Sequence, residues 1–110
     1  MTLESAVESR VPARRGTQIE RTCIVLLQSE LDIAFGFLRL ADVETGSGNA
    51  THADELIAKA STSYKAVLDG LASVSLEFEE ERQLLREGVR MLQDAIRAVA
   101  RRRQAAASLY

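Results

Sequence analysis

Residues 19–41 read IERTCIVLLQSELDIAFGFLRLA, and this stretch holds two apolar rows where an ordinary surface helix holds one. Each row advances by alternating steps of three and four residues, the spacing of one face of an α-helix. The first seam consists of Ile24, Leu27, Leu31, Ala34, Leu38 and Ala41, and the second seam of Ile19, Cys23, Leu26, Glu30, Ile33, Phe37 and Leu40. The two seams span roughly 220° of a helix, so we expect its own chain or a partner to cover it on two sides.

Local signals place both ends of this helix, over about residues 17–44. Thr17 and Glu20 have the spacing of a capping box, in which a hydroxyl and a carboxylate bond the unpaired amides of a helix start. The exit is residues 45–49, TGSGN, where two glycines and an asparagine tolerate positive φ angles. This short connection predicts that the next helix runs antiparallel to the first.

Two further helices are predicted, over about residues 52–71 and 75–103. Thr51 and Asp54 offer a cap to the earlier one, and Gly70 with the serines after it indicates a turn. Acidic residues crowd the start of the last helix and arginines its end, as the helix dipole favours. The apolar stripes are Ala53, Ile57, Ala60, Tyr64, Val67 and Leu71 in the earlier helix, and Phe78, Leu85, Val89, Leu92, Ile96 and Val99 in the later one.

The domain prediction is a flexible N-terminal arm over residues 1–16, a three-helix domain over residues 17–104 and a C-terminal tail over residues 105–110. The arm mixes charged residues with Pro12 and shows no sustained periodicity. The chain has 110 residues, no tryptophan and one proline, a composition that favours helices. The predicted fold class is all-α, an up-down-up three-helix bundle with antiparallel neighbouring helices.

Charge and cysteine content narrow the classes of function. The formal net charge of −2 argues against attraction of the whole domain to nucleic acid or to an anionic surface. A single cysteine forms no internal disulfide, and residues 1–15 lack the apolar stretch of a signal peptide, so we expect a cytoplasmic location. The longest apolar run is residues 24–27, far short of the roughly 20 residues that span a bilayer, so no membrane insertion is predicted.

Glu30 interrupts the apolar second seam and is the first candidate for chemistry. In an up-down-up bundle it would lie near Tyr64, whose hydroxyl could donate to it, so Glu30 and Tyr64 form a candidate buried polar pair. Arginine or glutamine side chains of the third helix are alternative donors. A structural polar group is the leading interpretation, partner binding the second, and acid–base catalysis the last, because no second carboxylate completes a pair.

The remaining polar candidates predict neither catalysis nor a cofactor. Cys23 has no nearby activating partner, so we expect it to pack in the core. His52 is the only histidine, which is a weak metal signal, and the glycines at 46 and 48 lack the lysine of a phosphate-binding loop. We therefore expect a protein that is not an enzyme and has no catalytic residues, no bound metal and no cofactor.

An arginine cluster at the end of the third helix is a candidate basic patch, formed by Arg97, Arg101, Arg102 and Arg103. It supports an alternative function, an accessory protein that binds nucleic acid or anionic surfaces. No aromatic residue is interleaved with these arginines, and complementarity to the helix dipole explains them equally well. Nucleic acid is therefore not the favoured partner.

Two families of helical domains resemble parts of this chain. Ala60 and Tyr64, in the hairpin of residues 35–71, resemble the second helix of a tetratricopeptide-type hairpin. Residues 31–99 resemble microtubule-interacting-and-trafficking domains, with Ala60, Tyr64 and Leu68 in the second helix, then an acidic turn and a leucine-rich third helix. Both resemblances imply an interaction module, and the latter implies that partner helices bind in grooves between helices.

The favoured function is a small non-catalytic module for protein–protein interaction or self-association. Its partner is another protein or a second copy, since a contiguous apolar strip at helical spacing suits a helix-in-groove or helix-bundle interface. The candidate interaction surface is Leu26, Glu30, Ile33, Phe37 and Leu40.

Overall fold

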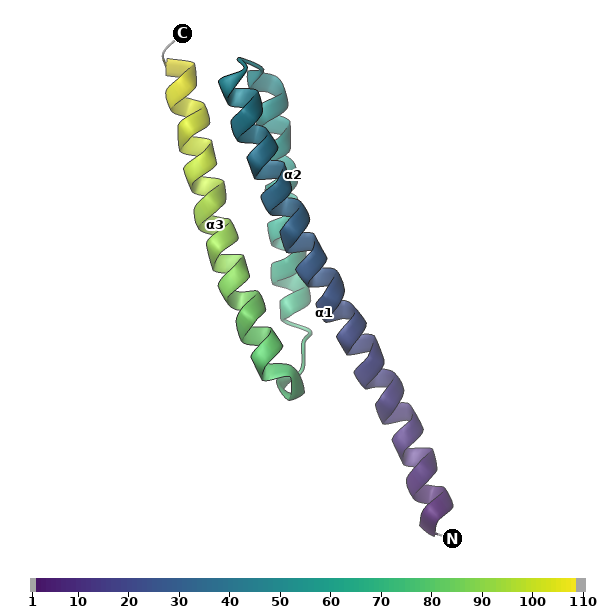
Figure 1. Ribbon diagram of the computed structural model, residues 1–110. Helices are drawn as coiled ribbons and strands as arrows, with labels where there is room; N and C mark the ends of the chain where they lie inside the picture. Colours follow the sequence, from purple (N-terminus) through teal and green to yellow (C-terminus); the bar gives the residue numbers. More distant parts are fainter. Residues whose placement is uncertain (1, 109–110) are drawn as a thin grey trace.

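The structure is a computed structural model that describes residues 2–108, with side chains from Gln18 to Ser108. Its elements are, in chain order, α1 (Thr2–Gly46), α2 (Ala50–Leu71), the short 3-10 helix η1 (Leu76–Phe78) and α3 (Glu79–Ser108). The described residues contain no strand. α1 and α3 run in one direction and α2 in the other, which confirms the all-α, up-down-up three-helix bundle (Figure 1).

The first helix begins much earlier than the sequence predicts. α1 is helical from Thr2, so residues 2–16 of the predicted arm are part of this helix and the capping box at Thr17 does not start it; residue 1 lies outside the described part. Glu, Ala and Arg in this segment favour helix, and Pro12 removes a backbone hydrogen bond without ending α1. The segment nevertheless lies outside the bundle, because α1 continues past the turn between α2 and α3 (Figure 1).

The structure confirms some of the other predicted helix ends and corrects the rest. Gly48 has φ +80°, and the amide of Asn49 bonds the carbonyl of Glu44 at 2.8 Å, so the glycine turn ends α1 as predicted. The cap of α2 is Asn49, which accepts from the amide of His52, so the prediction of Thr51 as the cap was wrong. α3 extends through the predicted tail as far as Ser108, and residues 109–110 lie outside the described part.

The first seam of α1 forms the centre of the core. All its residues are buried except Leu27, which packs against the core from its edge. The stripes of α2 and α3 face this seam, and the largest fully buried side chains are Val67, Leu85 and Leu92. Four alanines are completely buried, and such small side chains allow helix axes to approach closely. They are Ala34, Ala41, Ala53 and Ala60.

Two helical glycines let α1 approach its neighbours. A Cβ atom at Gly70 would lie 2.5 Å from Leu27 Cδ2, and one at Gly88 would lie 2.8 Å from Leu31 Cδ1. α2 ends at Leu71, and the carbonyl of Gly70 accepts from the amide of Ser73 at 3.0 Å, so the turn predicted after Gly70 is confirmed. Both glycines provide room for leucines of the first seam.

Polar contacts join α1 to the turn at the other end of α2. The hydroxyl of Ser75 donates to Glu20 Oε2 at 2.7 Å. The guanidinium of Arg21 lies 5.4 Å from the centre of the Phe78 ring, which is itself buried. These contacts set the position at which α1 leaves the bundle.

Candidate interaction surface on the first helix

The second seam of α1 is open to solvent in the folded chain. Its large aliphatic side chains are half or more exposed: Ile19 at 64%, Leu26 at 62%, Ile33 at 50% and Leu40 at 53%. An isolated exposed leucine is ordinary, whereas four large side chains spaced by seven residues form one continuous strip. Neither α2 nor α3 covers this strip, because both stripes face the first seam.

Phe37 lies at the border between the strip and the core. It is half-buried and packs against the core, and Lys59 Nζ of α2 lies 5.8 Å from the centre of its ring. This distance allows a cation–π interaction, worth about 0.5–1 kcal/mol at an exposed site. Phe37 therefore anchors the edge of the second seam against α2 and contributes less free surface than the aliphatic residues.

Glu30 and Tyr64 do not form the predicted buried polar pair. Both side chains are half-buried, and no hydrogen bond joins them or links Glu30 to a donor on α3. Among the described side chains, the buried polar atoms without a partner belong to Thr45 and Arg82, so the Glu30 carboxylate reaches solvent. The prediction assumed that other helices cover the second seam. Because the seam is uncovered, water can bond the Glu30 carboxylate and no donor from the protein is needed.

A row of small residues runs beside the exposed strip and was not recognised in the sequence. Thr22, Ser29 and Gly36 follow one another at seven-residue intervals, and they share the solvent-facing side of α1 with the strip. Exposed Val25 and Val43 lie on the other side of the row. The seven-residue spacing of these small residues is visible in the sequence. It could not be interpreted as part of a surface before the solvent-facing side of α1 was known.

These residues together are named the α1 face. It comprises the exposed strip Ile19, Leu26, Ile33 and Leu40, the small row Thr22, Ser29 and Gly36, and the valines Val25 and Val43. We call the small row between these larger side chains the trough of the α1 face, because its residues have the shortest side chains there. Such a trough fits the ridge of another helix.

A cavity of about 300 Å³ opens at the end of the α1 face where α1 leaves the bundle. Cys23 and Leu26 line one side and the end of α2 the other, so the cavity is continuous with the second seam. Cys23 is exposed here, and the prediction that it packs in the core was wrong. The cavity is lined by Glu20, Cys23, Leu26, Leu27, Gly70, Ser73 and Val74.

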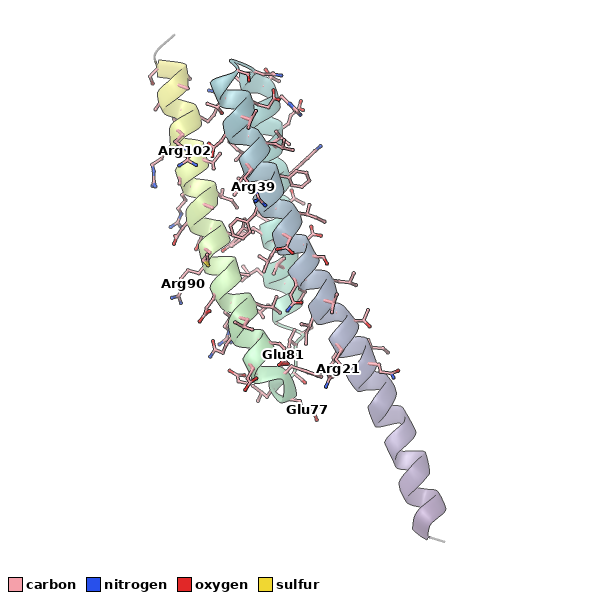
Figure 2. The ribbon with its side chains drawn as sticks, in the orientation of Figure 1. Arg21, Arg39, Glu77, Glu81, Arg90 and Arg102 are labelled. Carbon is pink, nitrogen blue, oxygen red and sulfur yellow. The ribbon has the colours of Figure 1, made fainter. Side chains whose placement is uncertain are left out.

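Two of the four arginines of the predicted basic patch form ion pairs within the chain. Arg102 donates twice to Asp42 of α1, at 3.0 and 2.8 Å, and its pKa is raised mainly by this hydrogen bond. Arg103 pairs with Asp54 of α2 at 3.0 Å. Figure 2 shows Arg102 on α3, level with the C-terminal part of α1. Only Arg97 and Arg101 remain exposed there without such a pair in the described structure.

The remaining polar candidates contribute local contacts. His52 Nδ1 lies 3.4 Å from Glu44 Oε2, next to the turn that joins α1 to α2. Across the described residues, no three side chains of the metal-binding types come together as a site. None of the described helices has the length and apolar character needed to cross a membrane.

Comparisons with known proteins add no relative. No protein-family model matches the chain, and neither curated proteins nor solved structures show significant similarity to it. The resemblances to tetratricopeptide-type hairpins and to microtubule-interacting-and-trafficking domains therefore stay predictions.

Proposed function

We propose that this chain is a non-catalytic interaction module that binds a helix of another protein molecule on the α1 face. One observation carries the proposal: the second seam stays exposed after the three helices have packed. Water contact with so many large apolar side chains is unfavourable by about 25 cal/mol per Å² of surface, so covering them favours association.

The shape of the α1 face supports a helix as the bound element. The exposed strip advances by seven residues, the period that keeps two helices in contact over several turns. The adjoining cavity offers a recess for a larger side chain of the bound helix. The free thiol of Cys23 suits a reducing compartment, so we propose the cytoplasm as the location.

A matched pair of triple variants tests the proposal. The face variant combines Leu26→Gln, Ile33→Gln and Leu40→Gln, and the control combines Leu76→Gln, Leu84→Gln and Met91→Gln. All six side chains are half or more exposed, so both variants should keep the helical content and thermal stability of the parent. Crosslinked complexes are isolated from cells of the native source, and their proteins are identified and purified.

The expected result is a loss of binding in the face variant alone. A purified partner, or the purified chain itself, should bind the parent and the control with similar affinity and the face variant at least about tenfold more weakly. Titration calorimetry provides the measurement. Equal binding by both triple variants, or no purified complex that depends on the face, would contradict the proposal.

A further inference from the structure

Gly36 is a helical glycine that nothing in the described chain requires. A Cβ atom at Gly70 or Gly88 would meet a leucine of α1, whereas a Cβ atom at Gly36 would have no neighbour within 4 Å. Glycine is among the poorest helix formers, so its presence in the middle of α1 weakens the helix without a benefit inside the chain. The open space above Gly36 suits the close approach of a second helix from outside.

The small row extends this close approach along α1. Ser29 lies about 10.5 Å from Gly36 along α1, so a neighbouring helix would meet a small residue again two turns earlier. Val43 and Ser29 lie seven residues to either side of Gly36, and Ile33 and Leu40 flank it closely. An axis of twofold symmetry at Gly36 would therefore place Ser29 level with Val43, and Ile33 within one residue of the level of Leu40 on the same edge.

The charges beside the face have the same symmetry. Asp32 and Arg39 are exposed on one edge of the α1 face, on either side of Gly36, and within the described structure neither forms an ion pair. Figure 2 shows Arg39 on the front of α1 at the middle of the bundle. In two antiparallel copies centred on Gly36, Asp32 of each copy would lie on the same edge as Arg39 of the other, about one residue away along the helix.

We propose that the occupant of the α1 face is a second copy of this chain, with the two α1 helices antiparallel and centred on Gly36. The inference rests on the proposed function and names its partner. An interface with twofold symmetry is self-complementary, so each contact occurs twice, including the Asp32–Arg39 pair. The overlap includes about 20 residues of α1, from Leu26 to Gly46, or about 30 Å of helix.

Other arrangements of two copies lose the Asp32–Arg39 pair. Parallel helices in register would put the edge that carries Asp32 and Arg39 on opposite sides of the helix pair, so the two residues would not meet. An antiparallel pair centred on residues 29–30 would move Asp32 of one copy away from Arg39 of the other. The arrangement centred on Gly36 keeps this pair, places the two Gly36 residues together and sets Ser29 level with Val43.

Sedimentation equilibrium of the full chain tests the inference. We expect a monomer–dimer equilibrium between about 1 and 300 μM, with a dissociation constant on the order of 10 μM because a single helix pair is a small interface. Gly36→Leu should weaken the dimer at least about thirtyfold, since the new side chain fills the floor of the trough. The same change improves helix propensity at an open position, so the monomer should stay folded.

Charge reversal tests the direction and the centre of the pair. Asp32→Arg and Arg39→Asp alone should each weaken the dimer about tenfold, whereas the double reversal restores the pair and should return the affinity to within about threefold of the parent. Gln83→Leu, an exposed position on α3, is the control for Gly36→Leu and should leave the dissociation constant unchanged.

The outcomes separate this inference from the proposed function. The parent chain could stay monomeric at about 300 μM while a different purified protein binds through the α1 face. That result would overturn the proposed dimer and leave the proposed interaction module standing. A monomer without any partner that depends on the face would overturn both proposals. A dimer that tolerates Gly36→Leu, or that the double reversal does not restore, would place the interface elsewhere or in another register.

Discussion

At the scale of single residues, three helical glycines have different surroundings although the sequence presents them alike. Gly70 and Gly88 lie against leucines of the first seam, whereas Gly36 faces open space. In the first two, the missing side chain makes room for the core. Within a single copy of the chain, glycine at position 36 increases the freedom of the unfolded state and so lowers stability.

This contrast predicts opposite effects of one substitution. Gly36→Ala should raise the free energy of unfolding by about 0.5–1 kcal/mol, because alanine is the better helix former and has room. Gly88→Ala should lower it by about 1 kcal/mol, because Leu31 is buried and must move away from the new Cβ atom. Urea unfolding at low micromolar concentration provides both values, and a shift of the same sign in both variants would contradict the prediction.

At the scale of the helices, polar contacts fix α1 at both ends of the bundle. Near the turn between α2 and α3, Ser75 bonds Glu20. At the opposite end, α3 is joined to α1 by Arg102 and Asp42 and to α2 by Arg103 and Asp54. Apolar packing between helices is not directional, so these contacts help to select one register among several of similar burial.

The pair of Arg102 and Asp42 should contribute only modestly to stability. Both side chains are more than a third exposed, so a double-mutant cycle with Arg102→Ala and Asp42→Ala should give a coupling of about 0.5–1 kcal/mol despite the two hydrogen bonds. The coupling should fall in about 1 M NaCl because salt screens exposed charges. The hydrogen bond to Asp42 raises the pKa of Arg102 further above its usual range, so the guanidinium stays charged.

The measurement is urea unfolding of the parent, both single variants and the double variant at low and high salt. A coupling that is absent at low salt would show that the pair contributes nothing to the fold. One that is unchanged at high salt would point to packing by the Arg102 stem instead of charge.

At the scale of the whole molecule, the bundle is a narrow rod extended by its first helix. Its principal extents are 77 × 19 × 15 Å, and α1 has 45 residues against 22 in α2 and 30 in α3. The N-terminal part of α1 extends alone past the turn between α2 and α3 (Figure 1). The core therefore depends on the part of α1 that follows this extension.

Removal of residues 2–16 should leave the bundle intact. We expect the midpoint of thermal unfolding to change by less than about 2 °C, because this part of α1 has no neighbouring helix. Circular dichroism measures both the midpoint and the helical signal, which should fall in proportion to the residues removed. A midpoint lower by more than about 5 °C would show that the extension supports the core.

The N-terminal extension also shows why local signals misplace a helix end. Thr17 and Glu20 have the correct spacing for a capping box, and Pro12 is a typical breaker, yet α1 passes through both. Such residues are compatible with a helix end, but they do not force the helix to end there. The cap of α2 is a second example. Thr51 is a suitable capping residue, but the turn before α2 puts Asn49 at the cap position.

The sequence by itself determined three helices, their order and most residues of the core. Apolar periodicity and turn residues are local properties, and the first seam is buried as its spacing predicts. Only the tertiary structure decided that the second seam is uncovered, that Glu30 has no partner on Tyr64 and that Cys23 is exposed. The reason is that exposure depends on where α2 and α3 lie around α1, and periodicity along one helix carries no information on that placement.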